Sequence, residues 1–277
     1  MLQLGFNEAT CKENSCVSQD IRLCGKFGYQ AIELRLDMLK KYFEKHTIEE
    51  LKNLLDEHKI QPFALNSIEN INFCTPEEWE ELLKLFTFAC ETAQAINNPY
   101  IVVVPTMTDK YQTRSEKEVT ADSVKVLNQL ADIADSYGVK LAFEPIGDRR
   151  WCCNSLRHGI EIIKEVNRDS VGLVVDCINF YMHDKCSDLT SISKIPAGKL
   201  FVFHLNDCED LPFGELDHCH RIMPGQGCIP IADISRAVQD AGYNGPACLE
   251  LFRPEYWEME AEEVIELGAI CSAPYLK

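Results

Sequence analysis

The sequence predicts a single (β/α)8 TIM-barrel domain over residues 1–277, with a long loop after the seventh strand over the C-terminal mouth. Three observations support this fold class. Short apolar runs alternate with longer amphipathic stretches, which is typical of βα units on a parallel sheet. The runs start 28 to 47 residues apart, and eight such units fill the ~250 residues of a typical barrel. The runs are almost continuously apolar, as expected for a sheet buried on both faces.

The expected elements follow one another without a linker or low-complexity segment. The strand candidates are residues 2–7, 30–35, 61–66, 99–105, 139–145, 171–176, 199–205 and 246–251. The clearest helical patterns cover residues 75–96 and 115–138. In the first helix, an apolar stripe at helical spacing should face the core; it consists of Trp79, Leu82, Leu83, Phe86 and Cys90. Thr75 and Pro76 are expected as its N-cap and first residue, and Gly138 as the stop after the second helix.

One connection is much longer than the others. Residues 206–230 follow the seventh strand candidate and are rich in Gly, Pro, Asp and His. A connection of this length is usually either disordered or functional. Because it follows a strand that ends in a metal-type residue, we expect it to cover the active site. We refer to residues 206–230 as the long connection.

Four strand candidates end on a residue that can bind a metal ion, namely Glu144, Asp176, His204 and Glu250. The C-terminal ends of barrel strands share one face, where active sites lie. Any one of these residues could instead be a helix cap or a member of a loop salt bridge. Glu144 and Glu250, however, follow apolar runs, where an unpaired carboxylate is very costly. The available cations are a metal or an arginine (Arg149, Arg150, Arg221 or Arg253), and four ligand-type residues on four strands favour the metal.

Three carboxylates and one imidazole suit one divalent ion, with Mn²⁺, Mg²⁺ or Co²⁺ preferred and Zn²⁺ tolerated. A bound 2-hydroxyketone could give such an ion both of its oxygens, and loss of the α-proton would leave a metal-held enediolate. Glu144 and Glu250 are the candidates for removing and returning that proton. The alternative is that all four residues are ligands only and that the base lies elsewhere.

Further residues could form the pocket around a small polyhydroxy ketone. Arg221, in the segment RIMPGQG, could hydrogen-bond a substrate oxygen or could be an ordinary surface arginine. Asn179 could donate to substrate or belong to a turn. Pocket-wall positions are also expected for Asn7, Glu33 and Asn66, which lie at or near the ends of the first three strands. His218 and His220 are expected to be solvated.

Composition argues against several classes of partner. The formal net charge of −17 disfavours binding to nucleic acid or anionic membranes, and no apolar run reaches the ~18 residues of a membrane span. No secretory signal opens the chain, so the 14 scattered cysteines are expected to be reduced and the protein cytoplasmic. The phosphate-binding glycine patterns of nucleotide sites are absent from the sequence. The sequence is compatible with formation of a homo-oligomer.

With these residues identified, the chain resembles the xylose-isomerase-like sugar isomerases and epimerases nearly end to end, and within them the bacterial inosose isomerases. The resemblance is carried by GFNEAT (5–10), VNRDSVGLVVD (166–176), EDLPFGELDHCHRIMPGQG (209–227) and ELFRPEYW (250–257). It implies one divalent ion on Glu144, Asp176, His204 and Glu250, with proton exchange between the two glutamates and substrate contact by Arg221. In this group, histidine is common three positions after the metal aspartate. Asn179 stands there and cannot carry a proton near neutral pH.

The expected activity is therefore interconversion of keto-inositols, of the type 2-keto-myo-inositol to 1-keto-D-chiro-inositol. A ketose 3-epimerase, a hydroxypyruvate-type isomerase and a keto-inositol dehydratase could use the same site. An abasic-site endonuclease on this fold would require more histidines and less negative charge. A binding protein without turnover is the remaining alternative.

Overall fold

Eight parallel strands close into a barrel in the computed structural model, which describes residues 1–108, 114–212 and 214–277. The strands pair in the order β1-β10-β7-β6-β5-β4-β3-β2. They are β1 (Gln3–Asn7), β2 (Ala31–Arg35), β3 (Gln61–Ile68), β4 (Tyr100–Val103), β5 (Lys140–Phe143), β6 (Val171–Asp176), β7 (Leu200–Leu205) and β10 (Pro246–Leu249). Each corresponds to one of the predicted strands, so the predicted fold class is confirmed.

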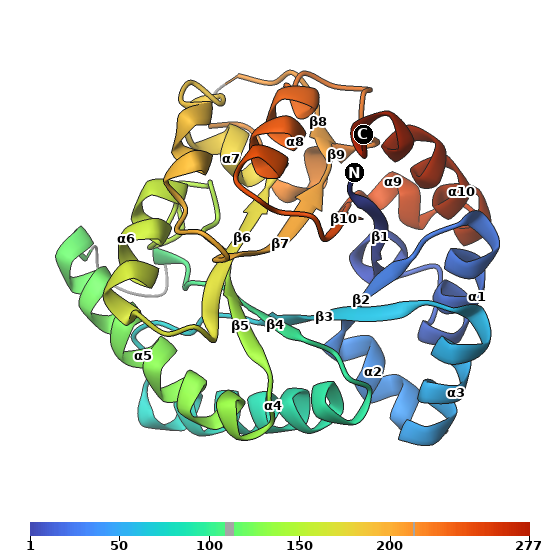
Figure 1. The fold of residues 1–277 in the computed structure, drawn as a ribbon, viewed down its shortest axis with the longest axis horizontal. Helices are drawn as coiled ribbons and strands as arrows, with labels where there is room; N and C mark the ends of the chain where they lie inside the picture. Colours follow the sequence, from blue (N-terminus) through green and yellow to red (C-terminus); the bar gives the residue numbers. More distant parts are fainter. Residues whose placement is uncertain (109–113, 213) are drawn as a thin grey trace.

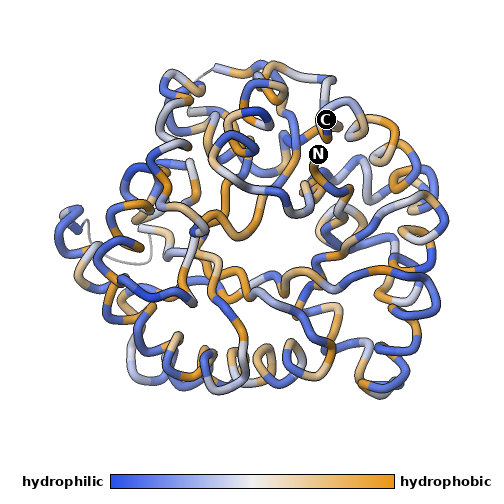
Figure 2. The backbone as a smooth tube through the Cα atoms, viewed as in Figure 1, coloured by the Kyte–Doolittle hydropathy of each residue, from blue (hydrophilic) through white to orange (hydrophobic). Residues whose placement is uncertain are grey.

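Helices surround the barrel as an outer ring (Figure 1). The longer ones are α1 (Val17–Phe27), α2 (Leu36–Phe43), α3 (Ile48–His58), α4 (Pro76–Ala95), α5 (Glu116–Ser136), α6 (Leu156–Val166), α7 (Cys177–Asp184), α8 (Ile231–Asp240) and α10 (Ala261–Ser272), and α9 (Pro254–Trp257) is a single turn. The tube in Figure 2 is strongly hydrophobic along the central strands and mixed along the outer helices. This is the distribution expected when a sheet is buried on both faces and each helix buries one face.

The predicted helix ends are confirmed. Thr75 caps α4 through a capping box with Glu78, and Pro76 is the first helical residue. Ser115 and Glu118 form the same motif at the start of α5. Gly138, with φ of +70°, ends that helix in the left-handed conformation that favours glycine.

The core has two parts, separated by the alternation of side chains along the strands. One apolar cluster lies between the sheet and the helices. The second consists mostly of strand residues that alternate with the first and fill the barrel interior. In the interior, the ring of Tyr100 packs against those of Phe63 and Phe201 at centroid distances of 5.4 and 5.0 Å.

The long connection is organised by its own short hairpin, which sequence patterns did not predict. Strand β8 (Asp207–Cys208) pairs antiparallel with β9 (Arg221–Ile222). The buried carboxylate of Asp207 accepts backbone N–H groups of Cys208, Gly225, Gly227 and Ile229 at 2.9 to 3.0 Å. Both stems of the connection are thereby fixed to one side chain. Phe213, which belongs to the predicted loop, lies outside the described residues.

Two acidic side chains, those of Glu8 and Asp20, are buried near the end of β1. Glu8 opens the short helix η1 (Glu8–Cys11) and accepts the backbone N–H of Arg35 at 2.6 Å. Asp20 lies on the buried face of α1. Burial raises the pKa of Asp20 to about 8, against an opposing effect of the Ser15 hydroxyl. Burial, together with the charge of Asp20, also raises the pKa of Glu8 well above its usual range.

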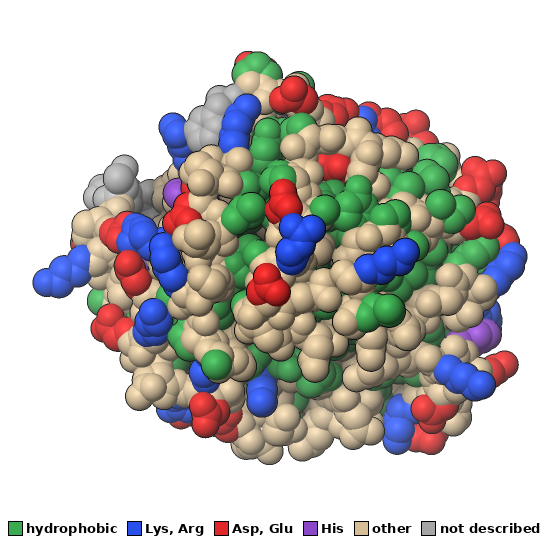
Figure 3. All heavy atoms as spheres, turned by 45° about the horizontal axis from the view of Figure 1, so that its top comes forward, with side chains coloured by type: hydrophobic (Ala, Val, Ile, Leu, Met, Phe, Trp, Pro, Cys, Tyr) green, Lys and Arg blue, Asp and Glu red, His purple; other side chains and the backbone are tan. Residues whose placement is uncertain are grey.

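The surface in Figure 3 carries charges of both signs, and the described cysteines form no disulfide bonds. On the face shown in Figure 3, the described Lys and Arg side chains lie among Asp and Glu side chains and form no continuous basic area. All 14 cysteines are free, and the sulfurs of Cys208 and Cys228 approach to 3.8 Å. None of the described helices combines the length and apolar composition that a membrane span requires.

Candidate metal centre and active site

The alternation of side chains along the strands directs the four metal-type residues into the barrel. Ala142, Val174, Val202 and Cys248 belong to the interior cluster. Glu144, Asp176, His204 and Glu250 each lie two residues further along the same chain segments, so their side chains fall on the same inner face. They therefore meet at the C-terminal end of the barrel.

The structure brings one ligand atom from each of these four residues to within 4.8 Å of the others. His204 Nδ1 lies 3.1 Å from Glu250 Oε2, 3.5 Å from Glu144 Oε1 and 3.6 Å from Asp176 Oδ2. All four residues are buried. Within the described residues, this is the one group of at least three His, Cys, Asp or Glu side chains with such spacing.

The second nitrogen of His204 has its own carboxylate partner. His204 Nε2 lies 3.1 Å from Glu33 Oε2, which also accepts Asn7 Nδ2 at 3.1 Å. An imidazole that binds a metal through one nitrogen usually donates its other N–H to a carboxylate or carbonyl, which fixes the ring and its tautomer. The sequence placed Glu33 at this end of the barrel but gave no signal for its pairing with His204.

Amide side chains surround the carboxylates. Asn179 Nδ2 donates to Glu144 Oε1 at 2.9 Å, and Asn206 Nδ2 donates to Asp176 Oδ2 at 2.7 Å. Glu250 Oε1 accepts Asn7 Nδ2 at 3.0 Å and Asn66 Nδ2 at 3.2 Å. Sequence reasoning missed Asn206, although its position two residues after His204 places it on the same face.

Arg221 reaches this cluster from the long connection and is 1% exposed. Its Nη1 donates to the carboxylate of Glu250 and to the Glu250 carbonyl oxygen at 3.1 Å, and lies 3.2 Å from Asp176 Oδ2. The surface position considered for Arg221 is therefore wrong. Its side chain lies at the centre of the candidate site.

The two glutamates differ in their electrostatic surroundings. Burial raises the pKa of Glu144 to about 7, although His204 acts in the opposite direction. Burial also opposes ionisation of Glu250, but His204 and Arg221 outweigh it and hold the pKa of Glu250 below its usual range. The surroundings therefore favour the protonated form at Glu144 and the ionised form at Glu250.

A cavity of about 190 Å³ opens above the cluster. Its walls include Glu144 and Glu250, together with Asn66, Arg221 and the aromatic rings of Trp151 and Phe252. Asn7 and Glu33 are fully buried and do not belong to this wall. Asn179 also lies outside it and contacts Glu144 instead. Among these polar residues, Asn66 and Arg221 are therefore the ones placed to touch a ligand directly.

His218 is less solvated than expected. This residue opens the short helix η4 (His218–His220), is half-buried and lines the same cavity. The hairpin β8–β9 turns the chain back over the barrel, which sequence patterns did not indicate. His220 is also half-buried, and its Nδ1 accepts the backbone N–H of Asp217 at 2.9 Å.

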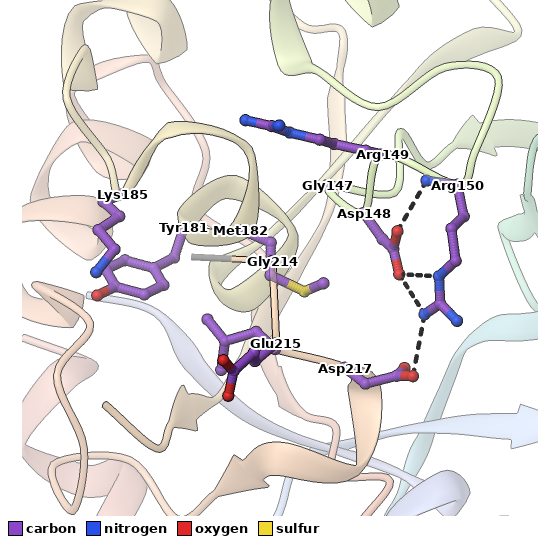
Figure 4. A pocket seen from close by; sticks show the side chains of 11 residues that line it. Gly147, Asp148, Arg149, Arg150, Tyr181, Met182, Lys185, Gly214, Glu215 and Asp217 are labelled. Atoms are coloured by element: carbon purple, nitrogen blue, oxygen red, sulfur yellow. Dashed lines mark hydrogen bonds and ion pairs between the residues drawn. The ribbon is translucent and has the colours of Figure 1, made fainter. Parts of the chain in front are cut away.

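A second cavity of about 340 Å³ lies beside the first, between α7, the segment after β5 and the long connection (Figure 4). Arg150 forms one side of it and donates to the carboxylate of Asp148 and, at 3.0 Å, to Asp217 Oδ2. This pairing joins the long connection to the segment after β5.

The residues present fit a divalent cation. His204 Nδ1 is buried without a hydrogen-bond partner and faces three carboxylates, while its Nε2 contacts Glu33. Three oxygen donors and one nitrogen donor form a ligand set for Mn²⁺, Co²⁺ or Zn²⁺. Glu144, Asp176, His204 and Glu250 would hold the ion, and Glu33 would orient the imidazole.

The fold and the site together define the class of protein. It is a parallel (β/α)8 barrel with three buried carboxylates and one histidine, a metal-binding type of cluster, at the C-terminal ends of its strands. The chain belongs to the xylose isomerase-like TIM barrel family, whose model matches residues 21–270. It is 38% identical over 266 residues to the inosose isomerase of Halalkalibacterium halodurans, covering 96% of this chain and 93% of that protein. The inosose isomerase of Bacillus subtilis is likewise 38% identical over 266 residues, covering 96% of this chain and 94% of that protein.

Solved structures share this fold. A crystal structure of the IolI protein with a binding zinc atom aligns with a TM-score of 0.93 and 36% identity, over 99% of this chain and 98% of that chain. D-psicose 3-epimerase from Clostridium cellulolyticum aligns with a TM-score of 0.75 and 18% identity, over 97% of this chain and 99% of that chain. At that identity, the epimerase shares the fold alone.

Proposed function

We propose that this protein is a divalent-metal-dependent isomerase that interconverts keto-inositols by moving a proton between adjacent ring carbons. The observation that carries the proposal is the meeting of Glu144, Asp176, His204 and Glu250 at the base of a 190 Å³ cavity. Full-length similarity to inosose isomerases supports a keto-inositol as the substrate class. A zinc-containing structure at 36% identity supports a divalent ion.

The residues of the site have different roles in this proposal. Asp176, His204 and both glutamates hold the ion, which when bound polarises the substrate carbonyl and stabilises the negative charge that follows proton loss. Glu144, held at Oε1 by Asn179, exchanges the proton through Oε2. Arg221 keeps Glu250 ionised on the other side of the site. Trp151 and Phe252 restrict access of water and offer apolar faces to a ring substrate.

Glu250 is the proposed second proton-transfer group, and Asn66 and Arg221 are the proposed substrate contacts. We assign Asn179, Asn7 and Glu33 supporting roles beneath the cavity, because their side chains contact the glutamates and His204. We also propose that residues 1–277 form one domain, since the barrel strands use the chain from Gln3 to Leu249.

A ketose 3-epimerase is the second candidate. D-Psicose 3-epimerase from Ruminiclostridium cellulolyticum is 25% identical over 145 residues, which cover 52% of this chain and 45% of that protein. Both reactions begin with removal of a proton next to a carbonyl. They differ in where the proton returns, so only product analysis separates them.

The test is incubation of zinc- or manganese-loaded protein with keto-inositols, D-psicose, D-fructose and hydroxypyruvate in deuterated water, followed by NMR. We expect a keto-inositol isomer with deuterium at the former carbonyl carbon. A C3 epimer of a ketose would favour the second candidate, and loss of water would indicate a dehydratase. Turnover without deuterium in any recovered sugar would contradict proton exchange with a carboxyl group.

The matched variants are Glu144→Gln and Glu165→Gln. The second residue is exposed on the outer surface of α6. Glu144→Gln should lower kcat by at least ~100-fold, the smaller end of the usual contribution of a general base. Glu165→Gln should match the unmodified protein. Equal activity of both variants would remove Glu144 from the mechanism.

A further inference from the structure

His218 has no role in the function proposed so far, yet it lines the cavity that contains Glu144 and Glu250. Its imidazole packs edge-on against Phe252, at a ring-centroid distance of 5.9 Å and an interplanar angle of 83°. The ring is therefore held in one place by an aromatic neighbour. A half-buried imidazole on a cavity wall can hydrogen-bond a ligand or water through any nitrogen that the protein does not occupy.

One of the two ring nitrogens of His218 already has a hydrogen-bond partner in the protein. His218 Nδ1 lies 3.2 Å from Arg221 Nη2. A guanidinium group has no acceptor, so Nδ1 must accept this hydrogen bond and cannot carry a proton. Burial and the nearby charge of Arg221 also lower the pKa of His218, to about 4, which agrees with a neutral ring. The proton of that neutral ring must then reside on Nε2.

The backbone of His218 is also fixed, by the carboxylate of Asp217. Asp217 Oδ1 accepts the backbone N–H of His218 at 2.7 Å, and Asp217 Oδ2 accepts Arg150 Nη2 at 3.0 Å. Figure 4 shows Asp217 directed toward Arg150 across the edge of the neighbouring cavity. Contacts thus run without interruption from Arg150 through Asp217, His218 and Arg221 to Glu250.

We propose that His218 is a positioning and substrate-contact residue, whose Nδ1 holds Arg221 against Glu250 while Nε2–H donates a hydrogen bond to an oxygen of the bound polyol. This inference rests on the proposed function, because it assumes a polyhydroxy ligand in the 190 Å³ cavity. It assigns two separate tasks to the two nitrogens of one ring. Substitutions that preserve one nitrogen at a time can separate them.

The test compares three variants in steady-state kinetics with the keto-inositol substrate. His218→Asn keeps an acceptor near the position of Nδ1, His218→Gln keeps a donor near that of Nε2, and His218→Ala keeps neither. Loss of one neutral hydrogen bond corresponds to a change of roughly 3- to 10-fold. We expect His218→Asn to raise KM by that factor with kcat nearly unchanged. His218→Gln should mainly lower kcat, because Arg221 loses its support, and His218→Ala should show both effects.

His183 provides the control, since it is an exposed histidine on α7. His183→Asn and His183→Gln should leave both constants unchanged. If the His218 variants also match the unmodified protein, the inference is wrong. If all three lose kcat and KM equally, His218 has only a structural role and the inference is likewise overturned.

A spectroscopic readout separates this inference from the proposed function. In zinc-loaded protein with ¹⁵N-labelled histidine, His218 at pH 7 should show a protonated Nε2 and an unprotonated Nδ1. Addition of myo-inositol, a stable polyol probe, should shift the Nε2 resonance. Absence of keto-inositol turnover with these NMR signals intact would refute the function but support the contact. A cationic or Nδ1-protonated ring would refute the role of His218 even in an active enzyme.

Discussion

The buried carboxyl of Asp20 gives a quantitative prediction about stability. Its pKa is about 8 in the folded protein and 3.8 in the unfolded chain. Below pH 4, both states are protonated and Asp20 has no effect on the free energy of unfolding. As the pH rises from 4 to 8, the unfolded state releases the proton first, so folding becomes progressively less favourable. Above pH 8, both states ionise and the penalty stops growing.

The size of this effect follows from the shift. About four pKa units, at about 1.4 kcal/mol each, correspond to an upper limit of roughly 6 kcal/mol at pH 8. Asp20→Asn replaces the carboxyl by a neutral group of the same shape and removes the penalty. The variant should therefore match the unmodified protein in stability near pH 4 and exceed it by several kcal/mol at pH 8.

The assay is urea unfolding followed by circular dichroism at pH 4, 5, 6, 7 and 8, with metal-free protein so that cation binding does not contribute. Asp56→Asn, an exposed position on α3, is the control and should give a small difference that does not change with pH. A constant difference between Asp20→Asn and the unmodified protein from pH 5 to pH 8 would refute the reasoning. It would mean that Asp20 is ionised in the folded state and has an unrecognised partner.

Three further predictions concern the site and its supports. Glu33→Gln should weaken zinc binding roughly 10- to 100-fold in competition with a chelator, since Glu33 contacts His204 Nε2; an unchanged affinity would contradict its orienting role. Removal of metal with a chelator should abolish turnover and lower the melting temperature, because zinc at 100 times its Kd adds about 2.7 kcal/mol; activity that survives chelation would exclude a catalytic ion. Gly227→Ala should cost about 1–3 kcal/mol of stability, because its Cβ would lie 2.1 Å from the Cys208 carbonyl oxygen; Gln226→Ala is the matched control, and equal melting temperatures would show that the turn adapts.

The sequence predicted most of the barrel because strand and helix signals are local. Apolar runs, capping residues and Gly138 each depend on neighbours within a few positions. The four metal-type residues could be grouped because the parallel barrel gives all strand ends the same direction. Their role as ligands stays a prediction, but their proximity is a property of the structure.

The supporting contacts could not be predicted, because they join segments far apart in the chain. Glu33 and His204 are separated by 171 positions, and Asn66 and Glu250 by 184. No pattern in one sequence distinguishes a buried partner of this kind from an ordinary strand-end residue. The position of His218 was missed for a related reason: the β8–β9 pairing rests on two residues from each strand, too few to leave a periodic signal.

The four backbone hydrogen bonds to Asp207 have a consequence for how this fold can diversify. Because one carboxylate hydrogen-bonds both ends of this segment, we expect the residues between them to tolerate exchange, except Arg221, which contacts Glu250 and Asp176. The long connection thus contributes part of the cavity wall, through His218 and Arg221, while the four metal-type residues belong to the barrel strands and the residues that directly follow them. Replacing the segment between Cys208 and Gly225 with that of a relative of different specificity should shift the substrate selectivity of this protein toward that of the relative.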